Sequence, residues 1–256
     1  VLGFQGVGTS YDIMQAMRYA AGLPNDSDTF PAQKADIINL SLGGAGFSPA
    51  MQELVDKVRA EGVIIIAAAG NDNTSAPLYP ASYSGVVSVS AVSISREKAA
   101  YSNFGPNIDV AAPGGDFSTP DVNGDGYPDG VLSTLGDDSS GALEDTYRFN
   151  SGTSMASPHV AGVAALMKSL NPELTPAMFD SMLAGDRLTL AHQLSGNNQV
   201  DAVWPSVHIL VNPEQFALEL LRRQGDRAEN AHTAGARYRR HDVAAVAEGK
   251  QGKIDA

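Results

Sequence analysis

The chain has 256 residues, of which 43% are hydrophobic, with 26 Gly and no Cys. This composition excludes a wholly disordered chain, and the absence of Cys excludes disulfides, thiol catalysis and Cys-ligated zinc. The formal net charge of −12 argues against sequence-independent binding of nucleic acid, because such binding needs a basic protein surface. No apolar run approaches the roughly 18 residues of a membrane-spanning helix, so no membrane contact is predicted.

Segments with helical and with strand-like patterns alternate along the first 204 residues. The predicted elements, in chain order, are a helix at 10–21 with Ser10 as its cap, a strand at 36–42, a helix at 49–61, strands at 63–69, 86–92 and 108–112, and helices at 154–170 and 175–184. The solidly apolar run at 63–69 is typical of a strand buried on both faces of a parallel sheet. This order predicts an α/β fold with a doubly wound, mainly parallel sheet and helices on both faces.

A change of charge near residue 204 predicts a domain boundary. Residues 1–204 carry a net charge of −13, whereas residues 205–256 carry +1. Beyond the boundary, 207–210 is predicted as one more strand, and Asn212 caps a predicted helix that ends at Arg223. The rest of the tail is polar and Ala-rich, which favours a loosely ordered extension over a ligand-binding tail.

A serine at the start of a predicted helix is the strongest candidate for chemistry. Residues 152–162 read GTSMASPHVAG, in which Gly152 allows a tight turn and Ser154 stands where the helix begins. Free backbone N–H groups and the positive end of the helix dipole favour negative charge at that point. Pro158 is tolerated because it falls within the first turn or so of the helix. Taken alone, a Ser-Thr pair before a helix is more often only a cap.

The whole run is similar, at every position, to the nucleophile motif of the subtilisin-like serine proteases. Other segments resemble that family in the same order: NLSLGG at 39–44 its substrate-binding strand, AAAGN at 67–71 the segment with its oxyanion-hole asparagine, YSNFG at 101–105 and VAAPG at 110–114 later sheet and turn elements, and QVDA at 199–202 its closing sequence. The resemblance covers about residues 1–204. It implies a subtilisin-like α/β catalytic domain that is incomplete at its N-terminus.

The resemblance also implies a role for each matching residue. Ser154 would attack the scissile carbonyl to form an acyl-enzyme, while the Asn71 amide and the Ser154 backbone N–H would hold the oxyanion, with the Thr153 hydroxyl assisting. An extended substrate would pair with three residues as an added strand and place its P1 side chain beside three small ones. The strand-pairing residues are Ser41, Leu42 and Gly43, and the pocket residues are Ala68, Ala69 and Gly70. Without the resemblance, these segments would indicate only strand packing and a turn.

The family's general base and orienting acid have no counterpart in these 256 residues. The family order along the chain is Asp, His, Ser, and neither an Asp-Ser/Thr-Gly turn nor a His-Gly-Thr-His motif occurs here. His159 follows Ser154 by five residues, which on a helix turns its side chain about 140° away, so it is predicted to be a packed helix histidine. We therefore expect a truncated or nicked enzyme that needs the missing N-terminal part of its domain, or an inactive relative.

A loop of closely spaced oxygen ligands spans residues 121–129, which read DVNGDGYPD. Oxygen side chains occupy positions 1, 3, 5 and 9 of a calcium loop, a carbonyl takes position 7, and Gly126 at position 6 allows the sharp turn. Position 12 is Leu132 instead of Glu, so water or nearby acids would complete the site. An Asx-rich turn without metal is the alternative. The predicted ligands are Asp121, Asn123, Asp125, Tyr127 and Asp129, with Asp116, Asp137 or Asp138 in support.

Together these patterns predict a serine endopeptidase that hydrolyses peptide bonds in protein or peptide substrates, with structural calcium and no organic cofactor. The alternative is a non-catalytic calcium- or peptide-binding module that reuses the same cleft. The resemblance implies a secreted or extracytoplasmic location, although no signal peptide is recognised in the chain.

Overall fold

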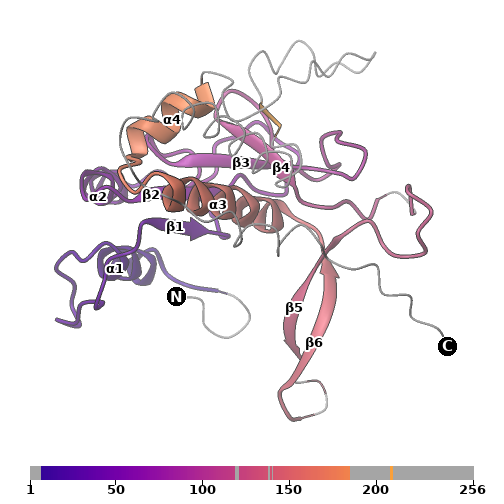
Figure 1. Ribbon diagram of the computed structural model, residues 1–256, viewed down its shortest axis with the longest axis horizontal. Coiled ribbons are helices and arrows are strands. Elements are labelled where there is room, and N and C mark those ends of the chain that lie inside the picture. Colours follow the sequence, from indigo (N-terminus) through magenta and orange to yellow (C-terminus); the bar gives the residue numbers. More distant parts are fainter. Residues whose placement is uncertain (1–6, 119–120, 138, 140, 185–207, 210–256) are drawn as a thin grey trace, which may run out of the picture. The chain divides into compact units, whose positions relative to one another are not determined.

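Five parallel strands form the central sheet of the computed structural model, which describes residues 7–118, 121–137, 139, 141–184 and 208–209. Their spatial order is β1-β2-β3-β4-β7, and each neighbouring pair is parallel (Figure 1). The predicted α/β fold is confirmed, and each predicted strand of the sheet lies within two residues of its expected ends. The strands are β1 (Ile37–Leu40), β2 (Ile64–Ala68), β3 (Val87–Val92), β4 (Val110–Pro113) and β7 (His208–Ile209).

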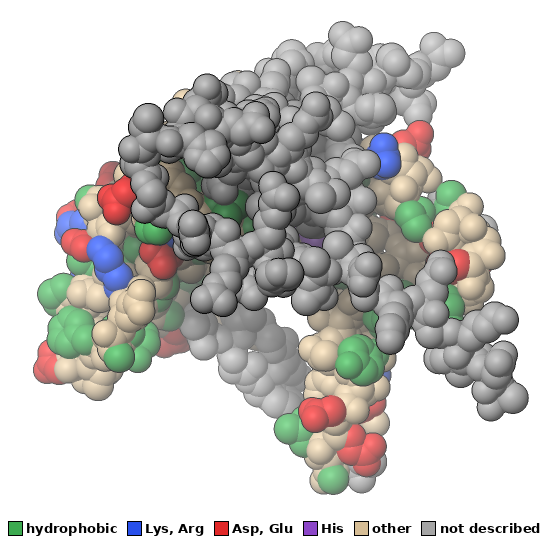
Figure 2. Space-filling model, viewed as in Figure 1, with side chains coloured by type: hydrophobic (Ala, Val, Ile, Leu, Met, Phe, Trp, Pro, Cys, Tyr) green, Lys and Arg blue, Asp and Glu red, His purple; other side chains and the backbone are tan. Residues whose placement is uncertain are grey.

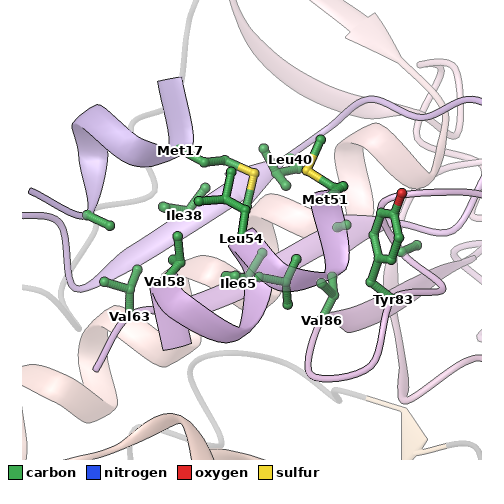
Figure 3. Packing of buried hydrophobic residues seen from close by; sticks show 14 residues of the cluster. Met17, Ile38, Leu40, Met51, Leu54, Val58, Val63, Ile65, Tyr83 and Val86 are labelled. Atoms are coloured by element: carbon green, nitrogen blue, oxygen red, sulfur yellow. The ribbon is translucent and has the colours of Figure 1, made fainter. Parts of the chain in front are cut away.

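Helices cover both faces of this sheet. Ile65 and Ala67 of β2 point to one face, where they join the buried side chains of α1 (Ser10–Ala20) and α2 (Pro49–Ala60) in one core (Figure 3). The other three residues of β2 point to the opposite face, which α3 (Thr153–Leu170) covers. All five residues of β2 are buried, and each buried Ile side chain contributes about 1.5–3 kcal/mol relative to an exposed one.

Local sequence signals set the ends of the helices. α2 begins at Pro49, with the Ser48 hydroxyl oxygen accepting a hydrogen bond from the Met51 N–H at 3.4 Å. The prediction that Ser10 caps α1 is wrong. The cap is Thr9, whose hydroxyl oxygen accepts a hydrogen bond from the Asp12 N–H at 3.1 Å. Ser and Thr both cap helices, so the pattern alone does not separate two such neighbours.

Small side chains let α3 lie close to the sheet. Ala156, Val160 and Ala164 recur on its buried face and are fully buried, as expected from the Ala- and Val-rich sequence of this helix. The following helix, α4 (Pro176–Ala184), buries Phe179 and is joined to α2 by an ion pair between Asp180 and Arg59 at 2.5 Å. α3 therefore packs along the sheet, and the ion pair links α4 to α2.

An antiparallel hairpin, which was not predicted from the sequence, leads into α3. It consists of β5 (Val131–Asp137) and β6 (Glu144–Asn150), paired from Val131↔Asn150 to Asp137↔Glu144. Most of its side chains are exposed, and apolar and acidic groups lie together on it (Figure 2). Because neither face is deeply buried, the apolar alternation that marks a strand in a sequence is weak here.

Several predictions for the second half of the chain fall at or beyond the described residues. β7 pairs with β4 and lies past the predicted boundary at 204, so the sheet continues beyond that boundary. The predicted helix from Asn212 to Arg223 and the tail after it lie outside the described residues, as does Asp138. In the ranges that the structure describes, no helix combines the length and the apolar character needed to cross a bilayer.

Candidate active site

The predicted site residues converge at the carboxyl edge of the sheet. Ser41 follows β1, Gly70 and Asn71 follow β2, and Ser154 stands in the first turn of α3. The Gly70 N–H donates to the Thr153 hydroxyl at 3.1 Å, and the Ser41 hydroxyl donates to the Ser154 carbonyl at 2.9 Å. Both loops therefore contact the start of α3. Open α/β sheets bind their ligands at this edge.

Thr153 holds the side chain of Asn71 in one orientation. The Asn71 Oδ1 accepts hydrogen bonds from the backbone N–H and from the hydroxyl of Thr153, both at 2.9 Å. Thr153 itself is completely buried. Because two donors engage Oδ1, the Nδ2 side of the Asn71 amide is turned away from Thr153. The Thr153 hydroxyl thus orients Asn71, and its expected assistance to the oxyanion stays a prediction.

Gly152 leaves an open space between Asn71 and Ser154. Its φ of 154° and ψ of 160° lie in a region that essentially only Gly adopts. A methyl group built on its Cα would lie 3.5 Å from Asn71 Nδ2 and 3.6 Å from the backbone N of Ser154. The two predicted oxyanion donors therefore border one common point. The absence of a side chain at residue 152 keeps that point free.

Asn103 fixes the loop that carries Asn71. Its side chain is 2% exposed, and its Oδ1 accepts hydrogen bonds from the N–H groups of Asp72 at 2.9 Å and Thr74 at 3.3 Å. Its Nδ2 donates to the Ala69 carbonyl at 2.9 Å. One buried side chain thus holds the loop on both sides of Asn71. In the sequence, Asn103 stands within the YSNFG motif at 101–105, and no local pattern there distinguishes a side chain that holds a distant loop.

The ammonium group of Lys98 supports the same loop. It donates to the Asn73 Oδ1 at 2.8 Å, and to the carbonyls of Ala99 at 3.1 Å and Ser102 at 3.2 Å. Burial lowers the pKa of Lys98, while the nearby negative charge of Asp116 acts in the opposite direction. Three oxygen acceptors around one ammonium group replace the water that burial removes.

The segments that are predicted to bind substrate border the same edge. Gly43 is exposed, whereas Ala68, Ala69 and Gly70 are buried at the end of β2. A methyl group on Gly43 or on Gly70 would come within 2.6 or 2.7 Å of Leu78 Cδ2, respectively. The Leu78 side chain therefore lies against both segments, and a side chain at either Gly position would have to displace it. Leu78 was not predicted to border the site, because no local pattern distinguishes it from other loop residues.

The hydroxyl of the predicted nucleophile, Ser154, has a backbone acceptor in this structure. The Ser154 hydroxyl donates to the Ser41 carbonyl at 3.3 Å. In the part of the chain that the structure describes, no imidazole or carboxylate forms a hydrogen bond with it. His159 Nδ1 lies 2.8 Å from the Met155 carbonyl on its own helix, in agreement with the prediction of a packed helix histidine.

The loop at 121–129 is organised by bonds between carboxylates and backbone amides. Asp121 accepts from the N–H groups of Gly124 and Gly126, each at 2.7 Å, and Asp129 accepts from the Val122 N–H at 2.7 Å. Gly126 has a φ of 83°, so the turn at this position needs Gly, as predicted. Among the described residues no group of three or more His, Asp or Glu side chains is arranged to hold a metal ion. The predicted calcium site also relies on an amide and a carbonyl, and it stays a prediction.

The supporting acids of that loop have other partners. The Asp116 carboxylate accepts from the N–H groups of Ala100 at 2.6 Å and Ser118 at 2.9 Å. Asp137, in the hairpin, accepts from the Ser139 N–H at 3.0 Å and lies 3.6 Å from Arg148. Water is therefore the simplest source of any further calcium ligand.

Known proteases match most of this chain. The Subtilase family profile matches residues 2–201. An extracellular protease of Xanthomonas campestris pv. campestris is 39% identical over 200 residues, and subtilisin DY of Bacillus licheniformis is 34% identical over 195 residues. Among solved structures, a protease of Pseudoalteromonas arctica PAMC 21717 aligns with a TM-score of 0.66 and 40% identity, covering 75% of this chain and 55% of that one.

The matches cover less of the relatives than of this chain. They take in 77% of the chain and 32% of the Xanthomonas protein, and 74% of the chain and 60% of subtilisin DY. Family profile, identity and fold agree over the residues that form the site. The chain is therefore a member of the Subtilase family, the subtilisin-like serine proteases.

Proposed function

We propose that the full-length protein containing this chain is a serine endopeptidase with Ser154 as its nucleophile. The observation that carries the proposal is the convergence of Asn71 Nδ2 and the Ser154 N–H on one point beside Gly152. An oxyanion placed between these two nitrogen atoms could approach both of them and accept a hydrogen bond from each. In subtilisin, loss of the corresponding asparagine costs about 10²–10³-fold in kcat, and that magnitude belongs to that enzyme.

The general base and its orienting acid come from outside these 256 residues in our proposal. His159 is engaged with its own helix, and the family motifs that carry the base and the acid do not occur in the sequence. Without a base the Ser154 hydroxyl is a weak nucleophile. We accordingly expect no proteolysis above background from residues 1–256 alone.

An extended polypeptide is the substrate that this edge would accept. Its backbone would pair with Ser41, Leu42 and Gly43 as an added strand. Its P1 side chain would lie against Ala68, Ala69 and Gly70, beside Leu78. The exposure of Gly43 next to buried pocket residues supports this division between strand pairing and pocket.

A fluorophosphonate probe tests the proposal in the full-length protein. The Ser154 hydroxyl oxygen would displace fluoride from phosphorus, so an activated Ser154 becomes covalently labelled. We expect labelling of the wild type and none of Ser154→Ala. The competing function is a non-catalytic peptide-binding module. Such a protein would bind peptides but leave the probe unreacted, and that result would refute the proposal.

We also propose a structural calcium ion in the loop at 121–129. The side chains of Asp121, Asn123, Asp125 and Asp129 and the Tyr127 carbonyl would hold it, and the ion would add a fixed positive charge that stabilises the exposed turn. Support comes from the positive φ of Gly124 and Gly126, which allows the sharp turn that the calcium-loop pattern requires.

A secreted or extracytoplasmic location completes the proposal. The relatives from Xanthomonas campestris and Dichelobacter nodosus are both named extracellular proteases. Immunoblotting of culture medium and cell fractions tests this location directly. Retention of the protein inside the cell would contradict it.

A further inference from the structure

A proline removes the helical donor for the carbonyl of the nucleophile. In an α-helix the carbonyl of residue i accepts from the N–H of residue i+4. The residue four positions after Ser154 is Pro158, which lies inside α3 and has no N–H. The Ser154 carbonyl therefore lacks this partner in the first turn of the helix. A backbone carbonyl without a partner is costly away from water.

The Ser41 hydroxyl supplies the missing donor. Its Oγ lies 2.9 Å from the Ser154 carbonyl oxygen, 2.9 Å from Asn39 Nδ2 and 3.0 Å from Ser157 Oγ. A hydroxyl has one proton and two lone pairs. The Asn39 amide nitrogen can only donate and the Ser154 carbonyl can only accept. The Ser41 proton therefore points to Ser154, and the Ser157 hydroxyl donates to Ser41.

We propose that the Ser41 hydroxyl is a positioning residue for the nucleophile, because it replaces the N–H that Pro158 lacks. This role belongs to the side chain and is separate from the substrate pairing of the Ser41 backbone. It rests on the proposed function. Ser41 binds the carbonyl of Ser154, and the same residue carries the nucleophilic hydroxyl and one of the two oxyanion donors. Movement of that residue would displace the nucleophile and the oxyanion donor together, and small displacements of reacting groups are costly.

The rate of fluorophosphonate labelling of the full-length protein measures this role. The probe is small and reacts without pairing to the substrate strand, so loss of backbone pairing does not confuse the result. In Ser41→Ala the partly buried Ser154 carbonyl loses its donor. The second-order rate constant of labelling should therefore fall about tenfold. The fall should lie in the maximal labelling rate, with little change in the probe concentration that gives half of it.

The variant Pro158→Ala separates positioning from a general structural role. It restores an N–H at residue 158 and so gives the Ser154 carbonyl a donor within the helix. In the Pro158→Ala background, Ser41→Ala should therefore slow labelling by no more than about twofold. The matched control is Ser169→Ala. The Ser169 hydroxyl also donates to a carbonyl of α3, that of Leu166, at 2.7 Å. This hydrogen bond is exposed and lies far along the helix from Ser154. Ser169→Ala should label at the wild-type rate.

The outcomes distinguish this inference from the proposed function. A wild-type protein that the probe does not label refutes the proposed function. If the wild type is labelled, an unchanged rate in Ser41→Ala, or an undiminished loss in the Pro158→Ala background, overturns the role of Ser41. Should Ser41→Ala fail to fold, folding and labelling restored in the double variant support the role, and failure to restore them overturns it.

Discussion

Replacement of Asn103 by Ala should produce a large loss of stability with a specific effect on the site. The buried Ala69 carbonyl loses its donor, which costs about 1–3 kcal/mol. The partly buried N–H groups of Asp72 and Thr74 lose their acceptor, at about 0.5–1.5 kcal/mol each. The free energy of unfolding should therefore fall by roughly 2–6 kcal/mol. For a domain of this size that lowers Tm by roughly 5–20 °C.

Thermal unfolding of the full-length protein followed by calorimetry checks this value. The control is Asn107→Ala, because Asn107 is exposed and lies only four residues away, and its Tm should stay within about 2 °C of the wild type. Since Asn103 holds the loop around Asn71, kcat at low temperature should fall while KM changes little. A Tm of Asn103→Ala as close to wild type as that of the control would refute the reasoning.

Three further predictions concern the oxyanion site and the calcium loop. Asn71→Ala should lower kcat about 10²–10³-fold with little change in KM, and a rise in KM alone would contradict its role. Gly152→Ala should block fluorophosphonate labelling, because a methyl group would occupy the space between Asn71 Nδ2 and Ser154 N; labelling at the wild-type rate would exclude an oxyanion site there. At 100 times Kd, calcium should stabilise the wild type by about 2.7 kcal/mol and Asp125→Ala much less, as measured by thermal unfolding with and without calcium; equal calcium responses would leave the loop a plain turn.

The main elements of the sheet could be predicted, and a candidate nucleophile could be named, because their signals are local. The run around Ser154 is specific in itself, and solid apolar runs such as that of β2 mark buried parallel strands wherever they occur. Pro49 and Gly62 place the ends of α2 to within about a residue. The hydrogen bonds and dihedral angles that begin or end a helix involve only neighbouring residues. The hairpin of β5 and β6 was not predicted, because it lacks such a local signal. Its strands are exposed, and exposure removes the apolar alternation that reveals a strand.

The arrangement of the site depended on partners that lie far apart in the chain. Thr153 and Asn71 are separated by 82 residues, and Ser41 and Ser154 by 113. Each of these side chains could have formed a cap or a turn with its neighbours, and nothing local selects the distant partner. Only the parallel order of β1 and β2, with α3 packed on the sheet and its first turn at their carboxyl ends, brings the groups within about 3 Å of one another. The sequence therefore named the candidate residues for the chemistry, and the tertiary structure decided which other side chains hold them in place, because a hydrogen bond depends on the distance between two groups in space and not on their separation along the chain.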